Sequence, residues 1–144
     1  MINVIVTLVG TQRDAQGEES RIELITAGHY YEKNNVRYIV YTDSEVSGLD
    51  GVKTMLKVYD QYVVLVRMGS VKHQQEFRLG TKSFSTYVTP YVTMDMGILT
   101  QNIDLALNAP IKSIYIRYEL EINGQWQSTN TLSISVREEN KSGY

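Results

Sequence analysis

Arg67 is the residue of this chain best suited to bind a charged ligand. It stands two residues after Leu65, the spacing that places two side chains on the same face of a β-strand. A buried guanidinium needs partners, and its five fixed donors suit a carboxylate or a phosphate. Three kinds of partner remain open: a ligand carboxylate, water at the strand end, or an internal acid among Asp43, Glu45 and Asp95.

Tyrosines supply further candidate ligand contacts. The chain contains 11 of them, and we expect Tyr41, Tyr91 and Tyr118 to line the same cavity as Arg67. A hydroxyl at the end of an apolar ring is typical of ligand sites. Thr54, expected beside Arg67, completes the set of candidate binding residues. Tyrosines on strands are also ordinary packing residues, so a purely structural role in the core is the alternative.

Signatures of catalysis and of metal binding are absent from the sequence. His29 and His73 are the only histidines, and neither has a nucleophile or carboxylate at a diagnostic spacing. The chain has no cysteine, which excludes thiolate chemistry and disulfides. The segment 43–48 begins like a calcium loop, but Thr54 replaces the glutamate that would close it. The sequence therefore predicts no catalytic residue, metal or cofactor.

Charge and hydropathy restrict the partners and the location. The net charge is -2 with Lys and Arg scattered among acids, so no basic surface for nucleic acid is predicted. No segment approaches the roughly 18 apolar residues of a membrane helix, and the outward strand faces carry charge, so we expect no membrane insertion. Residues 1–6 lack the features of a signal peptide, which favours a cytoplasmic location.

The elements that must position these residues are β-strands, because apolar and polar residues alternate at period two from Ile2 to Val136. Such a pattern is typical of an antiparallel sheet with one buried face, and a long sheet of this kind should close into a single barrel. We expect one domain over 1–144, with 138–144 as a flexible tail. Eight or nine strands are predicted: 2–12, 21–33, 36–43, 52–60, 62–69, 73–80, 86–108, 111–122 and 125–137.

Turn lengths predict the register of two hairpins. A two-residue turn at Asn34-Asn35 sets Glu32 opposite Arg37 and Tyr31 opposite Tyr38. A two-residue turn at Asp60-Gln61 sets Val58 opposite Val63, Leu56 opposite Leu65 and Thr54 opposite Arg67. Because the first two of these pairs are apolar, the second turn also predicts that Arg67 points inward.

Two departures from a regular ladder are also predicted. A three-residue loop of Ile122, Asn123 and Gly124 is expected, because a two-residue turn would set Ile114 opposite Ser133 and mismatch the apolar faces. The three-residue loop sets Ile114 opposite Leu132. A β-bulge is expected within 97–99, where the apolar residues change parity.

A set of short motifs spans essentially the whole chain. The motifs are Gly28-His29-Tyr30-Tyr31, Gly51-Val52-Lys53-Thr54, Arg67-Met68-Gly69-Ser70-Val71, Tyr87-Val88-Thr89-Pro90-Tyr91 and Ile116-Arg117-Tyr118. Together they resemble the YwiB-like family of bacterial proteins. The resemblance implies a compact β-barrel similar to the calycins, the class that contains lipocalins and fatty-acid-binding proteins, and an activity that is uncharacterised.

Three classes of function follow from these residues. The first is a module that binds a small, partly apolar ligand, such as an acyl chain with its carboxylate on Arg67. The second is a packed barrel that binds another protein or a second copy of itself through outward Met55, Tyr59, Val64 and Val66. The third and least favoured is an enzyme that uses Arg67, a tyrosine and Asp95. A barrel of this size is either filled by side chains or able to hold one small ligand, so its interior distinguishes the first two classes.

Overall fold

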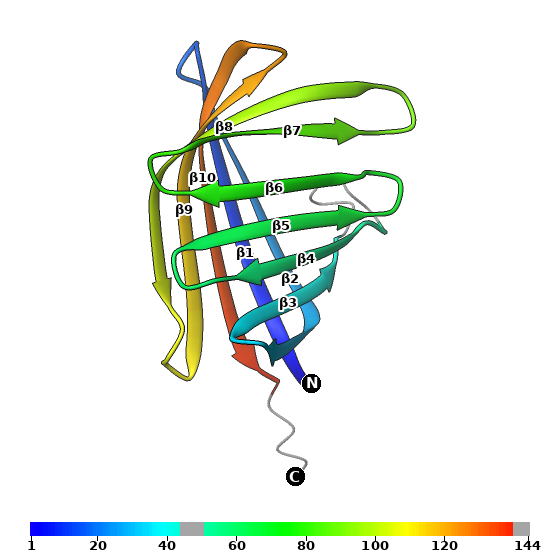
Figure 1. Ribbon diagram of the computed structural model, residues 1–144, viewed down its shortest axis with the longest axis vertical. Coiled ribbons are helices and arrows are strands. Elements are labelled where there is room, and N and C mark those ends of the chain that lie inside the picture. Colours follow the sequence, from blue (N-terminus) through cyan, green and yellow to red (C-terminus); the bar gives the residue numbers. More distant parts are fainter. Residues whose placement is uncertain (44–50, 140–144) are drawn as a thin grey trace.

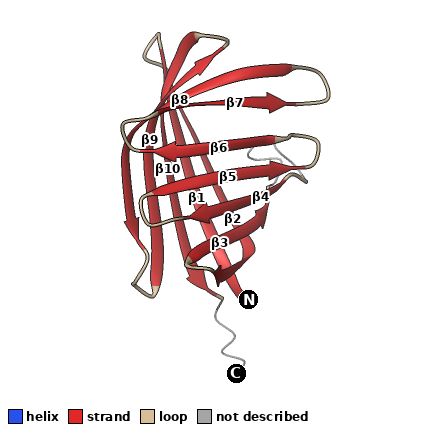
Figure 2. Ribbon diagram, in the orientation of Figure 1, coloured by secondary structure: helices blue, strands red, loops and turns tan. Residues whose placement is uncertain are grey.

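In the computed structural model, which describes residues 1–43 and 51–139, the regular elements are ten β-strands (Figure 2). They are β1 (Ile2–Asp14), β2 (Glu19–Lys33), β3 (Val36–Thr42), β4 (Lys53–Val58), β5 (Tyr62–Met68), β6 (His73–Arg78), β7 (Lys82–Val88), β8 (Thr93–Ala106), β9 (Ile111–Ile122) and β10 (Gln125–Glu138). Among the described residues, no helix of the length and apolar character needed to cross a membrane is found.

The strands form one antiparallel sheet with the order β6-β5-β4-β3-β2-β1-β10-β9-β8-β7. Its two edge strands, β6 and β7, meet at a single bridge between Lys72 and Val88, whose N–H groups each donate to the carbonyl of the other at 2.9 Å. The sheet therefore curves into a nearly closed barrel, in which β4, β5 and β6 cross in front of the long strands β1, β9 and β10 (Figure 1). The predicted all-β barrel is confirmed.

The strand count is ten, and the prediction of eight or nine is slightly low. The expected strand over 86–108 consists of two strands, β7 and β8, joined by a tight turn at Pro90 and Tyr91. The hydroxyl of Thr89 accepts hydrogen bonds from the N–H groups of Tyr91 and Val92 at 3.2 and 3.0 Å. This side-chain cap makes the turn possible in a segment rich in strand-forming residues.

Both hairpins with predicted two-residue turns are confirmed. Asn34 and Asn35 have positive φ values of 54° and 65°, as a type I′ turn requires. Across that turn, Tyr31 and Tyr38 pair and stack with ring centroids 4.7 Å apart. In the second hairpin, Leu56 pairs with Leu65 and Thr54 with Arg67. The length of each turn was sufficient to predict the residue pairing, because neither ladder contains a bulge.

The predicted three-residue loop in the third hairpin is wrong. Asn123 and Gly124 form a two-residue turn with φ values of 51° and 82°, and Gln125 pairs with Ile122. The register then shifts between Trp126 and Ser128, so that Ile114 faces Ile134. A bulge in β10 beyond the turn adds one residue to that strand. The apolar faces of the two strands therefore match although the turn has two residues.

The bulge predicted within 97–99 lies slightly farther along β8. The register with β9 shifts between Thr100 and Asn102, which leaves Gln101 as the extra residue. Leu99 is an outward residue, 37% exposed, and Thr100 is the next inward one at 1%. The inward and outward positions of β8 do change parity. Because Thr100 is buried and Leu99 is exposed, the pattern of apolar residues predicts this change slightly too early in the strand.

Inward side chains change from apolar to polar along the barrel. On β1 they run Val4, Val6, Leu8, Gly10 and Gln12, and on the paired strand β10 they run Val136, Ile134, Leu132, Asn130 and Ser128. The apolar end is filled by a core that includes Val6, Ile39, Leu56, Ile114 and Ile116. Each such fully buried aliphatic side chain stabilises the fold by about 1.5–3 kcal/mol. The space for a polar site therefore lies at the other end.

The C-terminal strand extends into the segment expected to be a tail. Glu138 pairs with Val4 in the β1–β10 ladder, and the N–H of Glu139 donates to the carbonyl of Asn3 at 2.9 Å. The rest of the expected tail, 140–144, lies outside the described residues, as does the segment 44–50 with Glu45 and most of the calcium-like motif.

Candidate functional site

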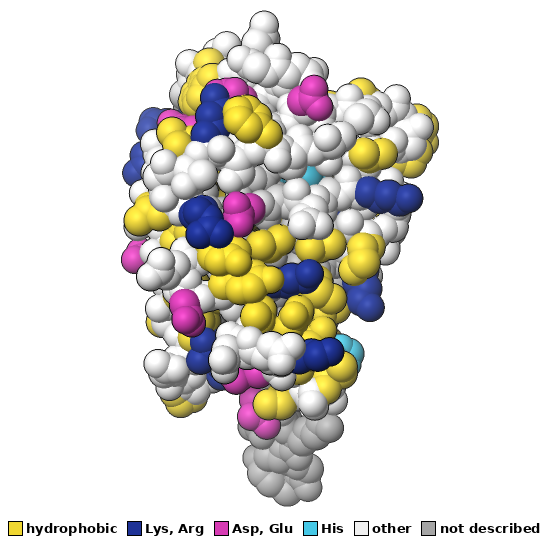
Figure 3. Space-filling model, in the orientation of Figure 1, with side chains coloured by type: hydrophobic (Ala, Val, Ile, Leu, Met, Phe, Trp, Pro, Cys, Tyr) yellow, Lys and Arg dark blue, Asp and Glu magenta, His cyan; other side chains and the backbone are white. Residues whose placement is uncertain are grey.

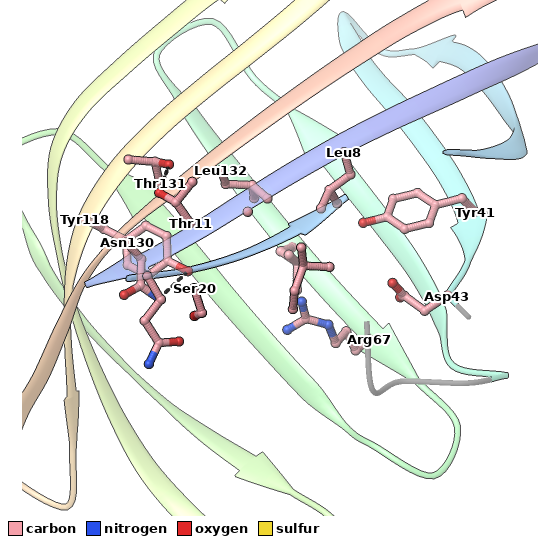
Figure 4. A pocket seen from close by; sticks show the side chains of 14 residues that line it. Leu8, Thr11, Ser20, Tyr41, Asp43, Arg67, Tyr118, Asn130, Thr131 and Leu132 are labelled. Atoms are coloured by element: carbon pink, nitrogen blue, oxygen red, sulfur yellow. Dashed lines mark hydrogen bonds between the residues drawn. The ribbon is translucent and has the colours of Figure 1, made fainter. Parts of the chain in front are cut away.

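A cavity of about 250 Å³ lies inside the polar end of the barrel (Figure 4). It is lined by Leu8, Gly10, Thr11, Gln12, Ser20, Ile22, Tyr41, Asp43, Leu65, Arg67, Tyr118, Asn130, Thr131 and Leu132. The lining combines aliphatic side chains with one cation, one carboxylate and two phenols. Such a mixture suits a small molecule that has both an apolar part and a charged group.

Three of the five predicted binding residues, Arg67, Tyr41 and Tyr118, line this cavity together. Thr54 is fully buried and donates to Asp43, so it supports the site without lining it. The prediction that Tyr91 lines the cavity is wrong. Tyr91 occupies the turn between β7 and β8, where its side chain is 95% exposed.

Arg67 extends from β5 into the cavity, with Tyr41 and Asp43 on one side and Tyr118 and Asn130 on the other (Figure 4). Its Nε atom is buried and has no hydrogen-bond partner among the residues that the structure describes. None of the ion pairs in the described part of the chain includes Arg67. An unmatched guanidinium inside a barrel is costly, and an anion would satisfy it.

The internal acids suggested as partners of Arg67 do not pair with it among the residues that the structure describes. Asp43 is 5% exposed and lines the same cavity, but its Oδ2 accepts a hydrogen bond from the hydroxyl of Thr54 at 2.5 Å. Asp95 is an exposed residue of β8 whose N–H binds the side chain of Asn123. Glu45 lies outside the described residues.

A directional chain of hydrogen bonds runs from Arg67 across the two edge strands. Arg67 Nη1 lies 3.4 Å from His73 Nδ1, which accepts because a guanidinium can only donate. His73 Nε2 lies 2.9 Å from the hydroxyl of Ser85, and that hydroxyl donates to Gln75 Oε1 at 2.7 Å. Gln75 Nε2 in turn donates to the carbonyl of Glu76 at 2.8 Å. The chain assigns the proton of His73 to Nε2.

His73, which contacts Arg67, is the residue of the candidate site that sequence reasoning missed. Burial, together with the positive charge of Arg67, lowers the pKa of His73 from 6.5 to about 4. The imidazole is therefore neutral near pH 7 and remains an acceptor for Arg67. A signal was present in the sequence, because the short turn after β5 sets Arg67 opposite His73 in the ladder with β6.

The two tyrosines of the cavity retain their protons. Burial, reinforced by the negative charge of Asp43, raises the pKa of Tyr41 well above 10.0. Burial likewise raises the pKa of Tyr118. Asn130 Nδ2 donates to the oxygen of Tyr118 at 3.4 Å, and the hydroxyl of Ser128 donates to Asn130 Oδ1 at 2.6 Å. Both phenols therefore act as neutral donors in the cavity.

Comparison with known proteins identifies the family. A family model described as "Domain of unknown function (DUF1934)" matches residues 6–134. The chain belongs to the DUF1934 family. It is 28% identical over 119 residues to the "Uncharacterized beta-barrel protein YwiB" of Bacillus subtilis. The aligned segment covers 83% of this chain and 82% of that relative. The predicted resemblance to YwiB-like proteins is confirmed.

The fold of this DUF1934 barrel is also similar to a solved structure. The crystal structure of the ywiB protein from Bacillus subtilis matches with a TM-score of 0.84 at 24% sequence identity. The match covers 96% of this chain and 93% of that chain. At this identity the match supports the barrel architecture, and the names of the relatives state no ligand and no reaction.

The hydrogen bonds of His73 in this DUF1934 barrel differ from those of a histidine that activates a serine. A histidine that activates a serine must accept the serine proton, whereas His73 donates to Ser85 and accepts from Arg67. The proton of Ser85 is directed at Gln75. Within residues 1–43 and 51–139, no three His, Cys, Asp or Glu side chains gather as metal ligands would. What the arrangement offers is one cation and two neutral donors beside an aliphatic wall.

Proposed function

We propose that this barrel binds a small, partly apolar carboxylate, with the carboxylate on Arg67 and the apolar part against Leu8, Ile22, Leu65 and Leu132. The observation that supports this proposal is that Arg67 lines a cavity, forms no ion pair with a described residue and has a buried Nε with no hydrogen-bond partner among these residues. Ligand binding would supply the acceptors that Arg67 lacks, and the phenols of Tyr41 and Tyr118 would add directional contacts.

The size of the cavity restricts the ligand. Its volume of about 250 Å³ is below the roughly 300–1,000 Å³ of sites for drug-sized molecules. The apolar end of the barrel is filled by the core, so a chain cannot extend deeper. The proposed ligand is therefore a short acid, and a long acyl chain of the kind held by hollow barrels is disfavoured.

Native mass spectrometry of protein purified from its own cells tests the proposal. We expect the wild-type protein to retain a small adduct and the Arg67→Met variant to lose it. Arg37→Met is the matched control, because the buried Nε of Arg37 also makes no hydrogen bond to a described residue, but it lies 3.4 Å from Oε1 of Glu32 in an ion pair. Wild-type protein without an adduct, or an adduct retained by Arg67→Met, would contradict the proposal.

A barrel that associates with a second copy of itself is the alternative function. Hydrophobic side chains gather on the outer face in front of β3 to β5, with cationic side chains among them (Figure 3). Tyr59 and Tyr62 stack there at 4.3 Å, and Met55 and Val66 are partly exposed. Sedimentation analysis tests this alternative: a dimer that dissociates on Val66→Lys substitution supports it, and a monomer at high concentration contradicts it.

A further inference from the structure

Resting on the proposed function, we propose that Arg67 receives the ligand carboxylate side-on, through its Nε–H and Nη2–H groups, and that His73 is the positioning residue that presents this edge. The proposal concerns how the anion is recognised and which second residue controls it. It follows from which nitrogens of the guanidinium are already engaged.

A guanidinium presents two edges that can hold both oxygens of a carboxylate. The side-on edge consists of Nε–H and the parallel N–H of Nη2, and the end-on edge consists of Nη1 and Nη2. In Arg67, Nη1 donates to His73 Nδ1 at 3.4 Å, so one of the two nitrogens of the end-on edge already makes a hydrogen bond. Nε is buried without a partner. The side-on edge is the one whose hydrogen bonds remain to be made.

His73 holds this orientation because its own hydrogen bonds are directed. Ser85 donates its own proton to Gln75 Oε1 at 2.7 Å, which leaves its lone pairs to accept from His73 Nε2 at 2.9 Å. The imidazole ring also packs edge-on against Tyr87, with centroids 5.1 Å apart. The two edge strands therefore fix the ring, and the ring fixes one end of the guanidinium.

The charges in the cavity select a monoanion. Arg67 contributes one positive charge, and the carboxylate of Asp43 lines the same cavity. A phosphate group carries about −1.5 to −2 charges near pH 7, so its second charge would be repelled by Asp43 without a further cation to match it. A carboxylate, with one charge and two oxygens in a plane, fits both the charge and the side-on edge.

The test uses benzoate as the probe and the side-chain Nε–Hε resonance of Arg67 as the readout in NMR titrations. Benzoate is expected to shift this resonance together with signals of Tyr41 and Tyr118. Benzamide, which has the same shape without the charge, and phenylphosphonate, which carries a second charge, are expected to bind at least tenfold more weakly. Arg67→Lys retains the charge but lacks the two parallel donors, and the same tenfold loss is expected.

Two variants of His73 separate its two hydrogen bonds. In His73→Asn the amide oxygen takes the position of Nδ1 and can still accept from Arg67. In His73→Gln the amide group reaches the position of Nε2, so the contact with Ser85 is retained and the one with Arg67 is lost. Benzoate affinity should remain within threefold of wild type in His73→Asn and fall at least tenfold in His73→Gln, with both variants shown to be folded by their backbone spectra.

The possible failures are distinguishable. If benzoate shifts Tyr41 and Tyr118 but leaves the Arg67 Nε–Hε resonance unmoved, the side-on inference is overturned while binding in the cavity stands. Equal affinity of Arg67→Lys or of folded His73→Gln for benzoate would overturn it as well. If benzoate perturbs no cavity residue, the inference also fails, and the retained adduct in native mass spectrometry decides the proposed function separately.

Discussion

Arg67 and His73 lie directly opposite each other on β5 and β6, and Nη1 of the first is 3.4 Å from Nδ1 of the second. This pair connects the interior cavity to the place where the barrel closes. It also brings together a permanent cation and an imidazole held neutral, so the stability of the site depends on pH.

The pH dependence of folding should report the protonation of His73. The pKa of His73 is about 4 in the folded protein, whereas its ordinary value, taken for the unfolded chain, is 6.5. Between pH 4 and 6.5 the unfolded chain therefore binds a proton that the folded protein does not. This contribution to stability is fully present above pH 6.5 and is lost as the pH falls to 4, by about 3 kcal/mol at most. Urea unfolding at pH 7, 5 and 4 measures it. In His73→Asn the loss over this range should be smaller, and an identical pH profile would show that His73 is not the cause.

Replacing Arg67 by methionine should leave the ligand-free protein as stable as the wild type or up to about 1 kcal/mol more stable. The reason is that an apolar side chain of similar length removes a partly buried charge that no described acid pairs with. Arg37→Met should lower stability by about 0–1 kcal/mol, because it removes a partly exposed ion pair with Glu32. Urea denaturation of both variants compares them, and a loss of more than about 3 kcal/mol in Arg67→Met would mean that the charge is matched within the protein.

Two buried threonines should respond to valine with opposite signs. Thr54 donates to the buried carboxylate of Asp43, so Thr54→Val should cost about 1–3 kcal/mol. The hydroxyl of Thr100 is buried without a partner, so Thr100→Val should raise stability by about 1 kcal/mol. Thr42→Val, at an exposed position of β3, is the control and should change little. Thermal melting of the three variants tests the pattern, which a loss in Thr100→Val would contradict.

Gly28 should not tolerate a side chain, whereas Gly10 should. A Cβ atom at Gly28 would lie 2.6 Å from the backbone oxygen of Val40, which cannot move without disturbing the ladder between β2 and β3. A Cβ at Gly10 would have its nearest neighbour at 4.0 Å. We expect Gly28→Ala to destabilise by about 1–3 kcal/mol and Gly10→Ala to be nearly neutral in urea unfolding. Similar effects at the two glycines would show that β2 adjusts freely.

Part of the site was predictable from local sequence. The two-residue turn at Asp60-Gln61 determines which residues of β4 and β5 face each other, and so it turned Arg67 inward beside Thr54. The positions of Tyr41 and Tyr118 in the cavity lining were predictable from the same alternation of inward and outward residues. Tyr91 did not, because a turn capped by the side chain of Thr89 interrupts a segment whose residues all favour a strand.

The contacts that hold Arg67 in place, through His73 and Ser85, depend on closure of the barrel. Ser85 meets His73 because β7 returns beside β6 after the sheet has curved round, and no turn length or parity in the sequence encodes that distance. The role of Asp43 was open for the same reason: only the packed structure shows that its carboxylate is engaged by Thr54 and not by Arg67.

The sequence by itself determined the all-β class, most of the strands, the family resemblance, the inward faces of the hairpins at Asn34-Asn35 and Asp60-Gln61, and the inward position of Arg67, because alternation and turn chemistry act between near neighbours in the chain. The tertiary structure alone decided that the apolar end is filled, that a small cavity remains at the polar end, and that His73 holds Arg67. These outcomes depend on how side chains from distant strands fill a closed volume, and the pairwise rules that set register carry no information about that volume.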